Sequence, residues 1–124
     1  MWSDRYNYYN IQSDLSFSKR IDTKEVVNIL LESRCFRQKG NQIFSNVEDF
    51  PWLDLVLVET RNGNFSSTDK EIPFVNLIAI VCSKGKNIDQ SVYIKTFLKI
   101  AKALEWKLYL EEDDDDNENV EITF

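Results

Sequence analysis

The chain has 124 residues, of which 43% are hydrophobic and 13% aromatic, and its formal net charge is −6. This length predicts a single domain over residues 1–124, and the apolar content excludes a disordered chain. The sequence has neither the pattern of a signal peptide nor an apolar run long enough for a membrane span. We therefore expect a cytoplasmic protein that does not enter a membrane and keeps its two cysteines reduced.

The negative charge is concentrated in one short segment. Residues 111–121 contain 8 carboxylates and no basic residue, whereas the rest of the chain has 13 acidic and 15 basic residues. The body of the protein therefore carries a charge of about +2, so the acidic segment needs an explanation other than general solubility.

The first half of the chain begins with a strand and a helix. Apolar residues at every second position predict a strand over residues 11–17. A helix should follow, with Asp22 as N-cap and Glu25 completing a capping box. Its apolar face predicts an end near Ser33 or Arg34.

Two further strand segments precede the middle of the chain. The half-apolar stretches on either side of Gly40 and Asn41 predict a hairpin. The segment PWLDLVLVE (51–59) predicts a strand in which Asp54 interrupts one of the two faces. We expect Trp52 to belong to the core, as aromatic residues beside a strand usually do.

The second half of the chain begins with a loop, followed by a strand and a helix. Residues 61–73 are polar and rich in turn residues, which predicts an exposed loop. Residues 74–83 are apolar on both sides, as in a central strand covered on both faces. The apolar spacing then changes to three and four residues, which predicts a helix from Asn87 or Asp89 to about Glu105.

The last segment predicts a terminal β-hairpin. WKLYL (106–110) and VEITF (120–124) both alternate, and residues 111–119 between them would form its acidic loop. The whole order predicts an α+β fold, a single-domain two-layer sandwich. An antiparallel or mixed sheet would carry both helices on one face, and the split β-α-β arrangement of ferredoxin-like folds is the simplest example.

The composition lacks most of the residues and motifs that enzymes use for catalysis. The chain has no histidine, which removes the commonest general base and the usual partner of a nucleophilic serine or cysteine. It also lacks a phosphate-binding loop, a dinucleotide fingerprint and paired metal-binding cysteines. We therefore expect a protein that is not an enzyme and that needs no cofactor.

A calcium-binding loop is the sharpest alternative for the acidic segment. A loop that starts at Asp113 places Asp115 and Asn117 where an EF-hand has ligands. However, Glu118 stands where the loop needs glycine, and Phe124 stands where it needs a bidentate glutamate. The sequence therefore predicts no specific metal site.

An acidic surface repels the phosphates of nucleic acids and attracts basic proteins, so we expect a protein partner and no nucleic acid. The helix that runs into IAKALEWKLYLEEDDDD (100–116), in a small chain without histidine, resembles bacterial immunity proteins. These proteins neutralise the toxin domains of contact-dependent inhibition and other polymorphic-toxin systems. The resemblance is one of architecture and is strongest over residues 92–121.

The resemblance implies a stoichiometric inhibitor that binds a cognate toxin, for example a nuclease, through a basic surface of that toxin. The acids would meet lysines and arginines of the toxin, and aromatic rings would supply the desolvated centre of the contact. The implied partner-binding residues are Tyr8, Tyr109, Glu111, Glu112, Asp113, Asp114, Asp115, Asp116 and Glu118.

Three other functions remain compatible with the same sequence. One is a nucleic-acid mimic that inhibits a nuclease or another DNA-binding protein. Another is a structural domain that forms homodimers through its sheet edges, with the acidic loop preventing further assembly. The third is an accessory domain that binds cations weakly. The acidic loop could also be a solvated loop without any partner.

Overall fold

The computed structural model describes residues 5–60, 71–84, 89–113 and 115–123. The two helices found there are α1 (Thr23–Glu32) and α2 (Gln90–Leu104). The strands are β1 (Tyr6–Gln12), β2 (Ile21–Asp22), β3 (Phe36–Gln38), β4 (Ile43–Asn46), β5 (Leu53–Val58), β6 (Phe74–Val75), β7 (Leu77–Ser83), β8 (Lys107–Glu112) and β9 (Glu118–Ile122).

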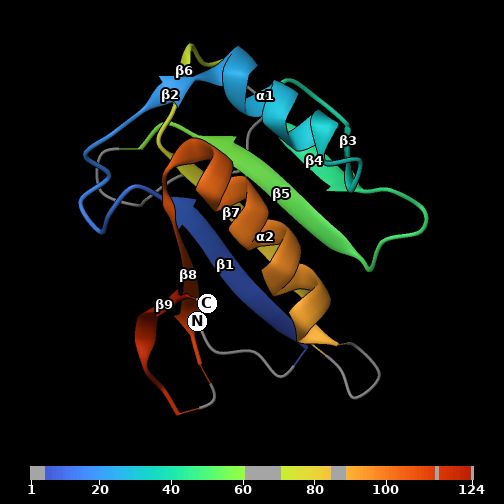
Figure 1. Ribbon diagram of the computed structural model, residues 1–124, viewed down its shortest axis with the longest axis vertical. Helices are drawn as coiled ribbons and strands as arrows, with labels where there is room; N and C mark the ends of the chain where they lie inside the picture. Colours follow the sequence, from blue (N-terminus) through green and yellow to red (C-terminus); the bar gives the residue numbers. More distant parts are fainter. Residues whose placement is uncertain (1–4, 61–70, 85–88, 114, 124) are drawn as a thin grey trace.

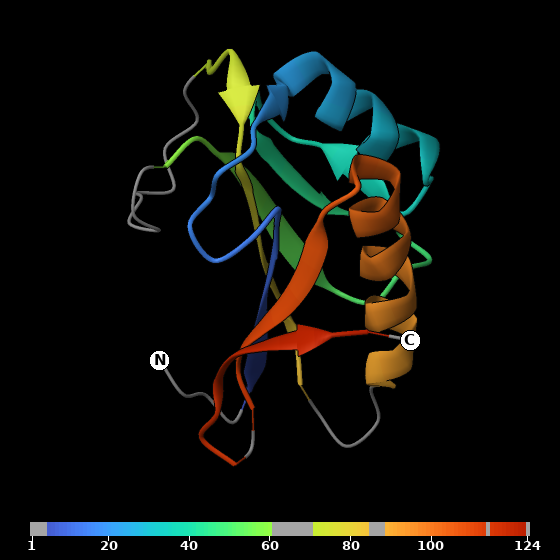
Figure 2. The same cartoon turned by 60° about the vertical axis from the view of Figure 1, so that its left-hand side comes forward.

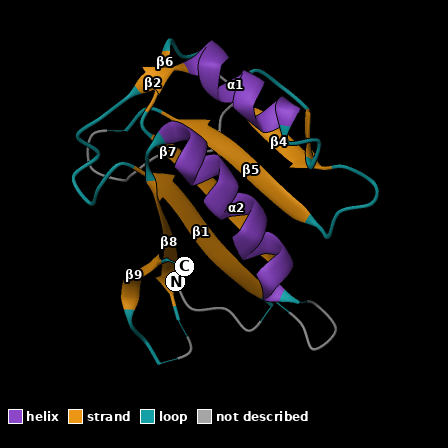
Figure 3. Ribbon diagram, viewed as in Figure 1, coloured by secondary structure: helices purple, strands orange, loops and turns teal. Residues whose placement is uncertain are grey.

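Seven of the strands in these described segments form one sheet, in the order β3-β4-β5-β7-β1-β8-β9 (Figures 1 and 3). All neighbouring strands in this sheet are antiparallel. Strands β2 and β6 pair separately at one end of the molecule. The predicted α+β class is therefore confirmed.

Both helices lie over the same face of the sheet (Figure 2). Helix α2 packs onto β1 through Phe97, whose ring meets that of Tyr9 edge-on at 5.3 Å between centroids. The ring of Tyr93 stacks on Phe97 at 5.9 Å, and all three side chains are at most 1% exposed. Aromatic pairs in such geometries add to the free energy of simple burial, so this cluster is the centre of the core.

A polar contact fixes the start of α2 against the sheet. The Gln90 side-chain oxygen accepts hydrogen bonds from Asn7 Nδ2 at 2.9 Å and from the Tyr9 hydroxyl at 3.2 Å. The Gln90 amide group in turn donates to the carbonyl oxygen of Ser83 at 2.7 Å. One side chain therefore joins α2 to both β1 and β7.

The predicted Asp22 is the N-cap of α1, and Asp89, one of the two predicted starts, is the N-cap of α2. The reciprocal bonds between Asp22 and Glu25 that define a capping box are not found among the described residues. The Asp22 carboxylate accepts a hydrogen bond from the Lys24 backbone at 2.9 Å, and Asp89 accepts one from the Ser91 backbone at 2.9 Å. These bonds satisfy backbone donors that have no partner inside the helix. Helix α2 ends at Leu104, and its C-cap Glu105 adopts φ 58°.

Because side chains alternate along a strand, packing one set against the helices sends the other set to the opposite face. In β5, Leu53, Leu55 and Leu57 point to the helices and are at most 2% exposed. We call the opposite side of the sheet the open face. Its central residues are Tyr8 and Asn10 of β1, Asp54 and Val56 of β5, Ala79 and Val81 of β7, and Tyr109 and Glu111 of β8.

The strand predicted over residues 11–17 is wrong in position, because β1 ends at Gln12. The Asp14 carboxylate accepts hydrogen bonds from the backbone and hydroxyl groups of Ser16 and Ser18. Such local bonds offer the backbone an alternative to a sheet ladder. Phe17 then adopts φ 56°, which ends any extended conformation.

The expected core position of Trp52 is also wrong. Its side chain is 42% exposed, and the residue lies just before β5 on the side of the open face. Its backbone is held by α2, because the Tyr93 hydroxyl donates to the Trp52 carbonyl oxygen at 2.6 Å. The helix therefore fixes the chain at this point while the indole ring remains accessible.

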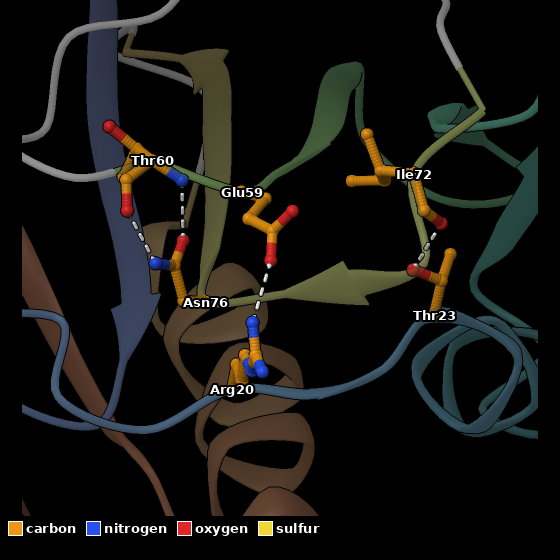
Figure 4. Close-up of polar contacts among 6 residues, drawn as sticks. All are labelled: Arg20, Thr23, Glu59, Thr60, Ile72 and Asn76. Atoms are coloured by element: carbon orange, nitrogen blue, oxygen red, sulfur yellow. Dashed lines mark hydrogen bonds and ion pairs between the residues drawn. The ribbon is translucent and has the colours of Figure 1, made fainter.

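The segment predicted as one central strand is divided at Asn76 into β6 and β7. The buried Asn76 side chain pairs with the backbone of Thr60, accepting from its N–H at 2.8 Å and donating to its carbonyl (Figure 4). Nearby, Arg20 lies over the Phe74 ring and 3.5 Å from Glu59. These contacts join the segment after β5 to the segments around β2 and β6 at one end of the molecule. Most of the predicted loop, residues 61–70, lies outside the described residues.

The two cysteines are free thiols, with Cys82 buried and Cys35 half-buried. Burial raises the pKa of the Cys82 thiol to about 12, so it is protonated and unreactive at neutral pH. Neither described helix is long and apolar enough to span a membrane.

The aromatic cluster under α2 gives a direct test of the core. We expect Phe97→Ala to lower the free energy of unfolding by about 3–5 kcal/mol, because it leaves a cavity among rigid rings. Val92→Ala, at a 39% exposed position of the same helix, should change it by less than about 0.5 kcal/mol. Urea denaturation followed by circular dichroism measures both. Equal effects of the two changes would contradict this packing.

Candidate functional site: a groove on the open face and an acidic hairpin

Strands β8 and β9 form the hairpin that was predicted, but its loop is shorter than residues 111–119. Pairing extends to Glu112 and Glu118, which lie opposite each other in the ladder. Glu111 also belongs to β8, so residues 113–117 alone connect the two strands. The acids at both ends of the predicted loop therefore have positions fixed by the sheet.

Asp113 organises the tip of this hairpin. One of its carboxylate oxygens accepts hydrogen bonds from the backbones of Asp115 and Asn117, each at 2.9 Å. The other accepts from the Asn117 side chain at 3.1 Å. These bonds, first among them those from Asn117, lower the pKa of Asp113. One carboxylate therefore holds Asp115 and Asn117 of the tip in place.

The other described acids of the tip face solvent. Asp115 and Asp116 are exposed, as is Glu118 at the start of β9, and Asp114 lies outside the described residues. Glu112 and Glu118 are directly opposite each other, an arrangement in which like charges repel. The hairpin therefore concentrates negative charge at one end of the sheet.

A groove of about 1070 Å³ runs over the open face. The hairpin lies at one end of it, and the loop that follows β1 contributes Leu15 and Phe17 to its lining. Figure 2 shows this loop on the side of the sheet away from the helices. The floor includes Tyr8, Asn10, Asp54, Val56, Ala79 and Val81.

The groove combines an apolar floor with carboxylates. Asp54, Glu111, Glu112 and Glu118 line it, and Lys39 is the basic residue among its described lining. Carboxylates beside a low-dielectric wall produce a stronger local potential than the same groups in open water. The groove therefore favours a cationic ligand that also has apolar surface.

The two tyrosines predicted as contacts have different environments. Tyr8 is half-buried and lines the groove. Tyr109 is 4% exposed, so its ring is part of the packing and is not an accessible contact. Burial, the Glu121 charge and the Asp14 charge raise the pKa of Tyr109, so its hydroxyl remains protonated. The structure thus brings Tyr8 together with Glu111, Glu112 and Glu118.

The N-terminal tyrosines are candidate contacts from sequence alone, but the pairing of Tyr6 with an accessible Trp52 at the hairpin end of the sheet was not predicted. The rings of Tyr6 and Trp52 lie 5.6 Å apart and are 39% and 42% exposed. Tyr6 is the first residue of β1 and Trp52 directly precedes β5, so only strand pairing brings the two rings together. The sequence did contain a signal for the position of Trp52. It alternates with Val56 and Val58, which places all three on the same face of the strand, opposite Leu53, Leu55 and Leu57.

Within the described residues, no group of three or more His, Cys, Asp or Glu side chains is arranged to hold a metal ion. Comparisons of the chain with protein-family models, with curated proteins and with solved structures gave no match.

The loop at the end of the groove should be sensitive to acid. Hydrogen bonds from Ser18 and Ser16 lower the pKa of Asp14 from 3.8 to about 2. The ionised carboxylate therefore stabilises the fold fully above about pH 4, and this contribution is lost as the pH falls towards 2. Asp14→Asn should lower the melting temperature at pH 7, and the difference from the unmodified protein should shrink to zero near pH 2.

Thermal unfolding at several pH values measures this difference. Asp49→Asn is the control, because the exposed Asp49 side chain has no hydrogen bond to the part of the chain that the structure describes. A deficit of Asp14→Asn that stays constant from pH 7 to pH 2 would rule out the carboxylate as its origin.

The order of the hairpin tip should depend on Asp113. Asp113→Ala removes three hydrogen bonds, so we expect the amides of Asp115 and Asn117 to exchange with solvent at least about tenfold faster. Asp115→Ala removes the same charge from a side chain that makes no hydrogen bond within the described segments. Hydrogen exchange followed by NMR compares them, and equal acceleration in both variants would disprove the role of Asp113.

Proposed function

We propose that this chain is an inhibitor of the bacterial immunity class, which neutralises a cognate toxin domain by covering a basic surface of it. The observation that supports this most is the position of the acidic hairpin beside an open, partly apolar groove. Tyr8, Glu111, Glu112 and Glu118 all line this groove. A protein surface with lysines and arginines set among apolar side chains is complementary to such a site.

The three parts of the site suit different stages of binding. Exposed carboxylates at the hairpin tip would attract a basic partner from a distance and speed its association. The Tyr6 and Trp52 rings would supply area that is buried on contact, as such residues do at the centres of interfaces. The groove floor would then select the side chains that fit.

Binding without catalysis agrees with the chemistry of the titratable groups. The chain has no histidine, and the buried Cys82 thiol has a pKa of about 12. Burial likewise raises the pKa of Tyr9 and of Tyr93. These groups are protonated at neutral pH and are poor nucleophiles or bases. We propose that the protein acts in the cytoplasm, without a cofactor.

We also propose that the fold is a two-layer sandwich of the split β-α-β, ferredoxin-like type. The strand order β8-β1-β7-β5 supports this, with α1 between β1 and β5 in the chain and α2 between β7 and β8. The β3–β4 hairpin and β9 would then be additions at the two edges. Such an arrangement leaves one sheet face without helices, as binding through that face requires.

Co-expression tests the proposed function. The protein encoded by the gene immediately upstream is produced in bacteria with and without this chain, and survival is scored. We expect growth arrest without the chain and rescue with it. An upstream protein that is harmless on its own would remove the support for an immunity function.

The contribution of the hairpin is tested with the purified pair. Replacement of Asp115, Asp116 and Glu118 by lysine should slow association at least about tenfold at low salt, because it reverses the attracting charge. The matched control replaces the exposed Glu32, Glu48 and Asp49 by lysine, which changes the net charge equally, and should slow it less than about threefold. Stopped-flow fluorescence measures both, and equal slowing would assign the effect to net charge alone.

A further inference from the structure

Asp54 is an anomaly within the sheet. It lies in β5, an interior strand of the sheet, on the side that continues with Val56 and Val58, where aspartate is disfavoured. The side chain is half-buried. Its carboxylate makes no hydrogen bond or ion pair with any residue that the structure describes. On β4, Ser45 lies opposite Asp54 and accepts a hydrogen bond from Arg37 Nε at 3.0 Å. Arg37 is therefore a cation on the same row of the sheet, but it makes no ion pair with Asp54, and a valine would suit a strand position better.

The surroundings of Asp54 define what could pair with it. Val81 is its neighbour on β7, and Tyr8 is the neighbour of Val81 on β1. A ligand cation above Asp54 would therefore have an aliphatic side chain and then an aromatic ring beside it. An arginine side chain matches this order, because its guanidinium pairs with a carboxylate in two places and its stem and flat head pack on apolar and aromatic surfaces.

A second carboxylate lies on the same row of the sheet. In β8, Glu111 follows Leu110, and Leu110 pairs with Tyr9 of β1. Because the two strands are antiparallel, Glu111 lies beside Tyr8, and it also lines the groove. From β5 through β7 and β1 to β8 there are three strand spacings, or roughly 14 Å at about 4.8 Å each. A carboxylate accepts hydrogen bonds from more than one donor, so Glu111 can receive a ligand in addition to its contacts within the chain.

An extended peptide rises about 3.3 Å per residue, so residues four positions apart are separated by about 13 Å and point to the same side. We propose that the groove binds an extended segment of the partner that crosses the strands. In that segment one arginine pairs with Asp54, and a second basic residue four positions away pairs with Glu111. The residue midway between them packs on Tyr8 and Val81. This inference rests on the proposed protein-binding function and names the partner chemistry.

A peptide titration tests the inference without any toxin. The probe is acetyl-Ser-Arg-Ser-Val-Ser-Arg-Ser-amide, added to the isotope-labelled full chain and followed by NMR. We expect the largest shifts at the amides of Tyr8, Asp54 and Val81. A control peptide of the same composition, acetyl-Ser-Arg-Ser-Arg-Ser-Val-Ser-amide, has its arginines two positions apart and should bind at least about fivefold more weakly. Equal affinity of the two peptides would overturn the predicted spacing.

Substitutions of Asp54 separate recognition from stability. Asp54→Asn should weaken binding of the first peptide about tenfold or more, as the loss of a charge-assisted contact does. Asp54→Val should weaken it as much and should raise the melting temperature, because a half-buried charge is replaced by a residue suited to a strand. A lower melting temperature of Asp54→Val would overturn the inference in favour of a structural role. So would an affinity of Asp54→Asn within twofold of the unmodified chain.

The outcome is distinguishable from failure of the proposed function. Rescue from the toxin together with no peptide shifts in the groove would retain the inhibitor and overturn the segment recognition. Peptide binding that depends on Asp54, together with an upstream protein that is harmless on its own, would retain the segment recognition and remove the support for the immunity function. A groove filled by a second copy of the chain would give a dimer in sedimentation and no peptide binding, which also overturns the inference. Asp49→Asn serves as the charge-matched control.

Discussion

The packing of α2 against β1 and β7 is the constraint on which the site depends. One side of β1 packs against α2, because the Tyr9 ring contacts Phe97 and Phe97 stacks on Tyr93. Gln90 fixes the start of the helix against both strands. A shift of β1 by one residue would turn every side chain to the other face. Tyr8 would then be buried and Tyr9 would lie in the groove, so the core fixes the identity of the binding surface.

The sequence predicted the elements whose signals are local. Asp22 and Asp89, both among the predicted helix starts, are the N-caps of α1 and α2, because a capping side chain and its backbone donor are neighbours in the chain. The alternation on each side of the acidic segment likewise predicted the β8–β9 hairpin. The end of β1 could not be predicted from alternation alone, because the hydrogen bonds of Asp14 override the same pattern after Gln12.

The groove could not be predicted, because strand pairing assembles it from distant segments. Alternation showed that Asp54 interrupts one face of its strand, but not which face the helices cover. The register places Val81 and then Tyr8 beside it, and that order cannot be seen in the sequence.

The carboxylates of the site fall into two groups that act over different distances. Exposed acids at the tip act over a range of about 10 Å that salt shortens, whereas Asp54 acts only at contact.

The acidic hairpin also determines how the sheet ends. Strand β9 is the outermost strand on its side, and an outermost strand presents backbone donors and acceptors to any other chain. Glu118 and Glu121 lie along this strand. Two copies that paired through it would bring four carboxylates close together, and within the described residues only each Glu121 has a counter-ion, Lys107 at 3.8 Å. The remaining repulsion opposes edge-to-edge aggregation. The carboxylates that would attract a basic partner therefore also help to keep the chain from polymerising with itself.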